Sequence, residues 1–324
     1  MTVERLELTV LFGERARADG GFLADAIAAI FARHELHLSV VLRGMAGFGA
    51  AQRLRTDRLL SLSEDLPVVT VAVDARDRIE AALRDIEALA FHPLATTERD
   101  IASPGEHAKL TVYARRGEQR GVVAALHRHG VAGATALLGV DGTVRGVRRR
   151  ARLVGDNRDV PVMVVSVGET DRIGAALAEM PGVESTLERV RICRRDGAAL
   201  AALPETGGGW QKVSVYTSEA TGQHDDLIER LRRDGAAGAT VLRGVWGYHG
   251  DHEPHGDRLL QLRRRVPVVT IVIDTPENVA RWAPIVEDVT ATTGLVTSEV
   301  VRVYVASAGG VRSARANPPN QSTS

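Results

Sequence analysis

The stretch Val41-Leu42-Arg43-Gly44, followed after a loop by Pro67-Val68-Val69-Thr70-Val71-Ala72-Val73-Asp74, decides the fold. Two hundred residues further on, the chain repeats both runs with no gap between them. The second copy reads Val241-Leu242-Arg243-Gly244 and then Pro267-Val268-Val269-Thr270-Ile271-Val272-Ile273-Asp274. Such a long, ungapped repeat predicts that the chain contains one fold more than once.

A third copy lies between these two and is less well preserved. It reads Leu137-Leu138-Gly139 and then Pro161-Val162-Met163-Val164-Val165-Ser166-Val167, and it needs one deletion in its loop. A period of about a hundred residues is too long for a solenoid repeat and suits one small domain per copy. We therefore predict three domains and a disordered tail that is small, polar and proline-bearing. The predicted bounds are 1–104 for repeat 1, 105–204 for the degenerate repeat 2, 209–305 for repeat 3 and 306–324 for the tail.

Each copy has the same predicted order of elements. An alternating strand is followed by an amphipathic helix, a second strand, a long loop, a third strand that begins at proline, a second helix and a last strand. This is the order of the ferredoxin-like fold, an α+β architecture with two helices on one face of a four-stranded antiparallel sheet. The strands that begin at Pro67, Pro161 and Pro267 are apolar on both sides, so the sheet face without helices must also be covered. The other two copies are the nearest cover, which predicts three sheets packed inward with their helices outward.

Composition excludes several classes of protein. Lys plus Arg equals Asp plus Glu, at 41 each in 324 residues, so charge does not favour nucleic acid or a membrane surface as a partner. The single cysteine, Cys193, excludes an intramolecular disulfide and fits a reducing compartment. No secretory signal precedes the strand-like run that begins at Leu6, and no apolar run approaches the roughly 20 residues that cross a bilayer. We expect a soluble, cytoplasmic protein that does not bind nucleic acid.

The loop that follows the second strand carries a family signature. Leu42-Arg43-Gly44, Gly47-Phe48-Gly49 and the run from Leu62 to Val69 resemble the bacterial family known as domain of unknown function 190, which is PII-like. The match is strong from Leu6 to Ile101, good in repeat 3 and weak in repeat 2. Members of that family usually carry one copy, so three copies in one chain are a departure from the family pattern.

The resemblance implies both an assembly and a role. PII proteins are trimers of ferredoxin-like subunits, so it implies that this one chain folds as a PII-like pseudo-trimer, alone or within a higher oligomer. It also implies regulation rather than catalysis, because PII proteins bind nucleotides and small anions in clefts between subunits and contact partners through their long loops. Here those loops are 44–65, 139–159 and 244–265. No cofactor is required, a nucleotide or other small anion is the expected effector, and relatives encoded beside fluoride-channel genes suggest a membrane channel or transporter as a partner.

Arginine and glycine supply the candidate ligand site. Guanidinium groups match phosphate oxygens, and glycine lets the backbone approach an anion closely. The middle loop holds Arg145, Arg148, Arg149, Arg150 and Arg152 within a few residues. Arg58, Arg152 and Arg258 share one register position in the three copies, where an ion pair between repeats is the alternative interpretation. The predicted ligand-binding residues are Arg43, Gly44, Gly47, Arg58, Arg148, Arg149, Arg152, Arg243, Gly244, Gly247 and Arg258.

A histidine-rich segment of repeat 3 supports a second hypothesis. His249, His252 and His255 are interleaved with carboxylates, and imidazole together with carboxylate oxygen can bind zinc, nickel or copper. This pattern suggests a divalent transition metal, in a metal sensor or a metal-dependent enzyme. A third hypothesis is a structural interaction module whose loops face a partner protein. The sequence contains no nucleophile–base–acid arrangement, so we predict that the protein is not an enzyme.

The chain has only two lysines, Lys109 and Lys212. Each lies near the start of the first strand of its repeat. We assign both to edge protection, because a charged side chain on an edge strand opposes pairing with another chain.

Overall fold

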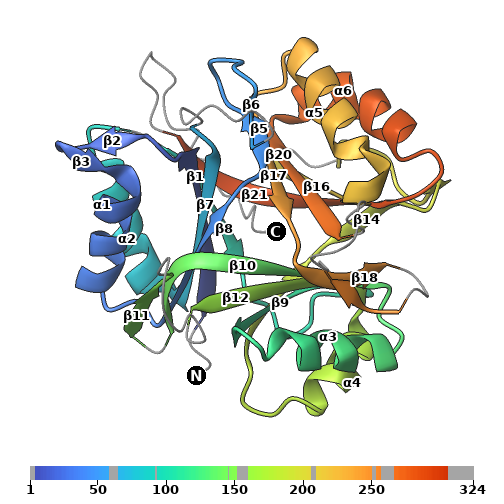
Figure 1. Cartoon of the computed structure of the whole chain (residues 1–324), viewed down its shortest axis with the longest axis horizontal. Coiled ribbons are helices and arrows are strands. Elements are labelled where there is room, and N and C mark those ends of the chain that lie inside the picture. The colour runs from blue at the N-terminus through green and yellow to red at the C-terminus, as the bar shows by residue number, and fades with distance from the viewer. Residues whose placement is uncertain are drawn as a thin grey trace, which may run out of the picture.

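The strands that begin at proline lie second from the edge in three similar four-stranded sheets. A computed structural model describes residues 4–57, 65–91, 93–144, 146–151, 160–205, 209–249, 253–256 and 266–305, and the predicted tail lies outside them. Within these residues the structure is mixed α/β, with a large, almost continuous antiparallel sheet and six α-helices. The helices lie at the periphery and the strands in the middle, as Figure 1 shows.

The three repeats have the same strand order. In repeat 1 the order is β4, β7, β1, β8, in repeat 2 it is β10, β12, β9, β13, and in repeat 3 it is β17, β20, β16, β21, with every neighbouring pair antiparallel. Repeat 1 consists of β1 (Arg5–Gly13), α1 (Leu23–Arg33), β4 (Leu38–Arg43), β7 (Pro67–Ala75), α2 (Arg76–Glu87) and β8 (Leu94–Arg99). Repeat 2 consists of β9 (His107–Arg115), α3 (Gln119–Arg128), β10 (Gly133–Val144), β12 (Pro161–Glu169), α4 (Thr170–Ala178) and β13 (Glu184–Arg189). Repeat 3 consists of β16 (Trp210–Ser218), α5 (Gln223–Arg233), β17 (Ala239–Arg243), β20 (Pro267–Asp274), α6 (Pro276–Val289) and β21 (Leu295–Val305).

The first helix of every repeat ends in the same way. The second residue after the helix has a positive φ, which lets the chain turn back into the second strand. It is Gly130 in repeat 2, with a φ of 65°, and Gly235 in repeat 3, with a φ of 77°. Repeat 1 has Glu35 at this place with a φ of 49°, so a non-glycine residue there accepts a conformation that costs of order 1 kcal/mol.

Each repeat has its own core between its sheet and its helices, and a further core joins the three repeats. That shared core contains β4 and β7 side chains of repeat 1, β9, β10 and β12 side chains of repeat 2, and Leu242 of repeat 3, with Tyr216 and Ile271 packed against it. The apolar second faces of the sheets therefore cover one another. The residues of this core are Leu38, Val40, Leu42, Val69, Val71, Val73, Tyr113, Leu137, Met163, Val165 and Leu242.

Strand pairing closes the repeats into a ring. After β4, the chain of repeat 1 forms β5 (Ala46–Phe48), which pairs with β17 of repeat 3. Repeat 3 in turn extends β18 (Trp246–His249) to β10 of repeat 2, and the far half of β10 pairs with β4 of repeat 1. The ends of the last strands make a second set of connections, because β14 (Arg191–Arg195) pairs with β21 and the end of β21 pairs with β8.

The repeated glycine of each loop is explained by this exchange of strands. A side chain at Gly47 would place its Cβ 2.4 Å from the carbonyl oxygen of Ala239 in repeat 3. At Gly247 the Cβ would lie 2.1 Å from the carbonyl oxygen of Ala134, and at Gly142 it would lie 2.3 Å from that of Ser39. Each glycine thus lies where the backbone of the next repeat passes, and only a residue without a side chain fits there.

Candidate functional site

The arginine-rich middle loop forms a hairpin on the surface. β10 runs beyond its own sheet, and β11 (Val147–Arg150) folds back on it after a turn at Gly146, which has a φ of 76°. Because the far half of β10 also pairs with β4, the hairpin lies at the junction between repeats 1 and 2. All four residues of β11 are exposed. We call β11 and the β10 residues that pair with it, Asp141–Val144, the arginine hairpin.

Two carboxylates partly neutralise the arginine hairpin. Arg148 makes a bidentate pair with the buried Asp141, with Nε–Oδ1 and Nη2–Oδ2 distances of 3.1 and 2.6 Å. The hydrogen bond to Asp141 raises the pKa of Arg148. Arg150 Nη1 lies 3.3 Å from Asp25 Oδ1 on α1 of repeat 1. The side chain of Arg149 donates to the carbonyl oxygen of Arg148 at 3.3 Å. The described hairpin therefore combines three guanidinium groups with two carboxylates, at the junction of two repeats.

Of the other predicted arginines, the two that the structure describes, Arg43 and Arg243, make ion pairs elsewhere. Arg43 Nη2 lies 3.0 Å from Glu14 of its own repeat. Arg243 bridges two carboxylates, Asp57 of repeat 1 at 3.0 Å and Glu219 of repeat 3 at 2.8 Å, and so ties the two repeats together. Arg58, Arg152 and Arg258, as well as Arg145, lie outside the described residues.

The predicted glycines lie at strand crossings between repeats. A Cβ at Gly44 would lie 2.6 Å from Pro67 Cγ and 3.1 Å from the carbonyl oxygen of Val241, and a Cβ at Gly244 would lie 2.9 Å from that of Pro267. With Gly47 and Gly247, these residues give the backbone room to pass between repeats. Their surroundings in the described structure are protein backbone and side chains.

The histidines of repeat 3 are divided between two local contacts. His249 Nε2 lies 2.7 Å from Asp196 Oδ1, which belongs to the turn after β14 in repeat 2. This contact and its charge lower the pKa of Asp196 against the opposing effect of burial. His255 begins β19 (His255–Gly256), and its Nδ1 lies 3.0 Å from the carbonyl oxygen of Glu253. His252 lies outside the described residues, so the metal site proposed for the three histidines stays a prediction.

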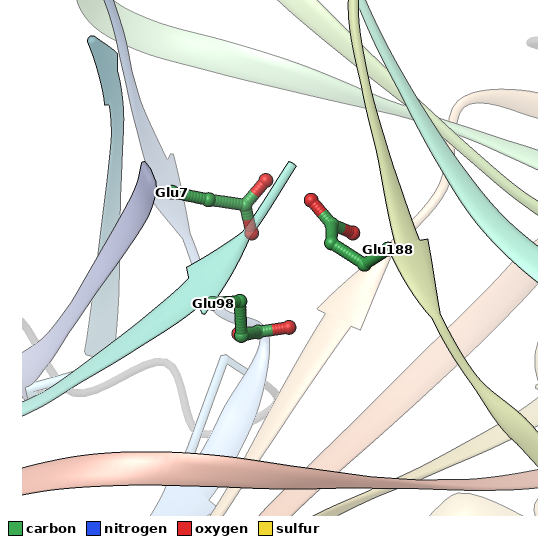
Figure 2. A group of neighbouring side chains, drawn as sticks. All are labelled: Glu7, Glu98 and Glu188. Atoms are coloured by element: carbon green, nitrogen blue, oxygen red, sulfur yellow. The ribbon is translucent and has the colours of Figure 1, made fainter. Parts of the chain in front are cut away.

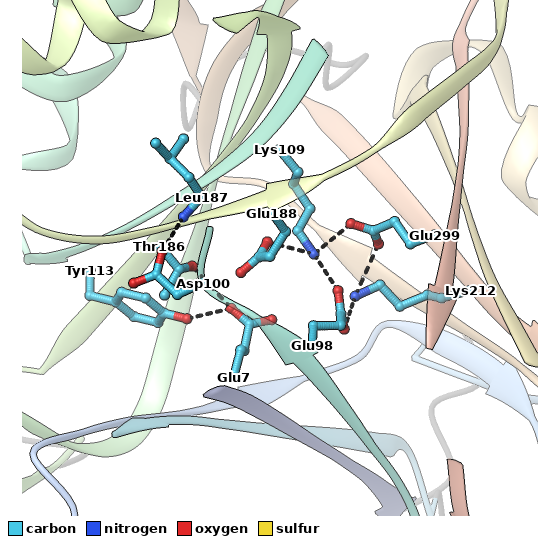
Figure 3. Close-up of polar contacts among 10 residues, drawn as sticks. All are labelled: Glu7, Glu98, Asp100, Lys109, Tyr113, Thr186, Leu187, Glu188, Lys212 and Glu299. Carbon is cyan, nitrogen blue, oxygen red and sulfur yellow. Dashed lines mark hydrogen bonds and ion pairs between the residues drawn. The ribbon is translucent and has the colours of Figure 1, made fainter. Parts of the chain in front are cut away.

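The assignment of the two lysines to edge protection is wrong. Lys109 and Lys212 are 4% and 6% exposed and lie where the three sheets meet. The first strand is flanked on both sides by neighbours in its sheet, so it is an interior strand and not an edge. Figure 3 shows the ammonium group of Lys109 among glutamates of all three repeats and that of Lys212 beside Glu98 and Glu299. We call this group the central cluster; it consists of Glu7, Glu98, Lys109, Glu188, Lys212 and Glu299.

Ion pairs cross the central cluster between repeats. Lys109 Nζ lies 2.8 Å from Glu98, 2.9 Å from Glu188 and 2.8 Å from Glu299, which belong to repeats 1, 2 and 3. Lys212 Nζ lies 2.6 Å from Glu98 and 3.2 Å from Glu299. Burial alone would lower the pKa of Lys109, but the surrounding carboxylates raise it well above its usual value. Burial likewise opposes ionisation of Glu98, yet the two lysines hold its pKa at about 2. The direction of both shifts favours the charged forms of Lys109 and Glu98.

A sequence signal for the central cluster exists in the repeat alignment. Glu7, Lys109 and Lys212 occupy the same position of the first strand, each followed by an alternating run such as Leu110-Thr111-Val112. Each faces a glutamate of the last strand, and these pairs are Glu7 with Glu98, Lys109 with Glu188 and Lys212 with Glu299. Charged residues repeated in the middle of apolar strands indicate a buried ionic site, and the alignment of the three copies would have found it.

The comparisons with known proteins agree with the repeat structure. The family model DUF190, described as "Uncharacterized ACR, COG1993", matches the chain three times, at residues 5–100, 109–192 and 210–303. The chain belongs to this family. It is also similar to a UPF0166 protein of Aquifex aeolicus (strain VF5), with 38% identity over 78 residues, which is 24% of this chain and 71% of that protein. No helix in the described part of the DUF190 chain is long and apolar enough to cross a membrane.

Proposed function

We propose that this DUF190 protein is a non-catalytic, PII-like regulator that binds a small anion, such as a nucleotide, at a junction between repeats. In this proposal each repeat is a ferredoxin-like unit, and the three units act as a PII-like pseudo-trimer within one chain. The matching strand order of the repeats and the ring of strand exchanges support it. The protein would work in the cytoplasm and contact its partner, with a membrane channel or transporter as one candidate, through the loops that follow the second strands.

The arginine hairpin is the observation that carries the proposal. It presents Arg148, Arg149 and Arg150 on one exposed strand against two nearby carboxylates, Asp141 and Asp25. Guanidinium groups bind phosphate oxygens through paired hydrogen bonds, and several on one surface attract a polyanion more strongly than a single charge does. Because Arg150 of repeat 2 pairs with Asp25 of repeat 1, an anion that binds Arg150 would compete with this ion pair between the two repeats. Binding could then be transmitted to the ring through β10, which pairs with both β12 and β4.

A ligand screen tests the proposal. Thermal unfolding of the full chain is measured with adenine nucleotides, cyclic dinucleotides, phosphate and sulfate. A ligand at a hundred times its Kd stabilises the native state by about 2.7 kcal/mol, which is a clear shift of the unfolding midpoint. The double variant Arg149→Ala/Arg150→Ala should lose most of that shift. Arg128→Ala, which removes an exposed arginine on α3, is the matched control and should keep it. Equal shifts in all three proteins, or no shift with any of these anions, would refute the proposal.

A further inference from the structure

The central cluster lacks one cation of a threefold pattern. The first-strand position holds a lysine in repeats 2 and 3, and the ammonium group of each contacts glutamates of two or three repeats. The same position in repeat 1 holds Glu7, which faces Glu98 across the sheet, and like charges directly opposite one another are destabilising. Repeat 1 thus places a fourth carboxylate where the pattern of its two sister repeats has a positive charge.

Three carboxylates converge at this place. Glu7, Glu98 and Glu188 are 4%, 7% and 2% exposed, and each offers an oxygen that lies within 4.8 Å of those of the other two. Figure 2 shows the three carboxylates directed toward a common space between β1, β8 and β13. Oxygens bound to one calcium or magnesium ion at about 2.0–2.6 Å lie roughly 3–5 Å from one another. The spacing of these oxygens is therefore suitable for a single hard cation.

Neighbouring side chains hydrogen-bond to these carboxylates and orient them, but one buried carboxylate oxygen has no hydrogen-bond partner among the described residues. Tyr113 donates its hydroxyl hydrogen to Glu7 Oε2 at 2.8 Å, and the Thr186 hydroxyl donates to the same oxygen at 3.3 Å. Glu188 Oε2 lies 2.9 Å from Lys109 Nζ, whereas the buried Glu188 Oε1 has no hydrogen-bond partner among the described residues. A buried carboxylate oxygen without a partner is costly, and a cation is one of the few groups that remove that cost.

The excess negative charge of the central cluster also favours binding of a cation. Its four carboxylates face two ammonium groups, so the fully ionised cluster carries two negative charges in excess.

We propose that Glu7, Glu98 and Glu188 bind one divalent cation of the oxygen-preferring class, such as Mg²⁺, Ca²⁺ or Mn²⁺, at the meeting point of the three sheets. The ion takes the place that a lysine ammonium of repeat 1 would take and balances the two excess charges. Carboxylate ligands select this class over the softer metals, which prefer sulfur and imidazole. Because the ligands come from β1, β8 and β13, the ion joins repeats 1 and 2 and stabilises the assembled ring. This site is separate from the arginine hairpin and from the histidines of repeat 3.

The experiment uses the full chain refolded from urea, because the buried site is filled most readily as the chain folds. One sample is refolded with EDTA, and others with millimolar Mg²⁺, Ca²⁺ or Mn²⁺. After desalting, bound metal is measured by plasma mass spectrometry and thermal unfolding by circular dichroism. We expect one equivalent of one of these cations per chain and a higher unfolding midpoint than in EDTA.

Two variants of Glu7 and one comparison variant distinguish a bound cation from other ways of compensating the buried carboxylates. Glu7→Lys supplies the missing ammonium, so it should hold no cation, unfold at the same midpoint with and without EDTA, and exceed the midpoint of the wild type in EDTA. Glu7→Gln removes one ligand with little change in shape and should also lose the cation. Glu299→Gln removes one of the four carboxylates but none of the three ligands, so it should weaken cation binding less than Glu7→Gln does.

The proposal is overturned if the wild type, refolded with Mg²⁺, Ca²⁺ or Mn²⁺, retains about one equivalent of none of these cations. It is also overturned if Glu7→Lys or Glu7→Gln retains as much cation as the wild type. A wild type that is unaffected by EDTA but gains stability on acidification would show that protons balance the cluster instead, and would likewise overturn it.

Discussion

The central cluster and the arginine hairpin contain the same kinds of charged group in opposite surroundings. In the cluster, Lys109 is 4% exposed and contacts glutamates of all three repeats. Its charge is therefore stabilised by these carboxylates and not by water. In the hairpin, the arginines face solvent, which screens their pairing with Asp141 and Asp25. The same kind of ionic contact is therefore buried between repeats in one place and exposed to solvent in the other.

The overall charge of the chain conceals this difference. Forty-one basic and forty-one acidic residues give a neutral protein. The fully ionised central cluster is nevertheless negative by two charges, while the described hairpin has three arginines beside two carboxylates. A protein with no net charge can thus have one region with an excess of negative charge and another with an excess of positive charge.

The largest expected effect is the loss of a buried ammonium group. Lys109→Met keeps the length and much of the volume of the side chain but leaves Glu98, Glu188 and Glu299 with less positive charge. Removing one partner of a buried ion pair typically costs about 3–5 kcal/mol, so the free energy of unfolding should fall by that amount. Urea unfolding followed by circular dichroism measures it.

A matched variant and an independent probe sharpen this prediction. Lys212→Met removes a lysine that contacts two glutamates instead of three and should cost less. Burial raises the pKa of the Cys193 thiol to about 12, so labelling of this thiol in the native protein should be slow and should accelerate in Lys109→Met. A loss below about 1 kcal/mol in Lys109→Met would mean that the cluster behaves like a surface ion pair.

Sequence repetition predicts the folding unit well but says little about how the units join. Pro67, Pro161 and Pro267 each begin a buried strand as predicted, and the family assignment from the first loop is confirmed. The strand exchange through β5 and β18 was missed, because short strands inside long loops have no hydrophobic period of their own.

The candidate site was predicted only in part, for a related physical reason. The arginines of the middle loop were recognised by their composition, and β11 places Arg148 and Arg149 on one strand. The assignment of Lys109 and Lys212 to edge protection is wrong because their strands are interior and the side chains are buried. The burial of Lys109 depends on side chains contributed by two other repeats, which no local pattern around this lysine reveals.

An intermediate effect is expected where the backbones of two repeats cross. Gly47→Ala places a methyl group 2.4 Å from the carbonyl oxygen of Ala239, so β5 and β17 must separate. Overpacking of a fitted site usually costs about 1–3 kcal/mol, and the unfolding midpoint should fall accordingly. Gly49→Ala is the control two residues away, since its Cβ would meet nothing within 4 Å, and it should leave stability nearly unchanged. Equal losses in the two variants would show that backbone entropy and not the crossing determines the cost.

The smallest effect on stability is expected in the arginine hairpin itself. Arg149→Ala and Arg150→Ala remove exposed side chains, and exposed ion pairs contribute at most about 1 kcal/mol, so each variant should unfold within that range of the wild type. The same urea titration that reports Lys109→Met measures this, at low and at high salt. Since solvent screens these charges already, salt should narrow the small difference further. A loss above about 2 kcal/mol would instead mean that the hairpin holds repeats 1 and 2 together. Its arginines would then belong, like the two lysines of the central cluster, to the assembly of the ring, and a ligand would have to compete with that role.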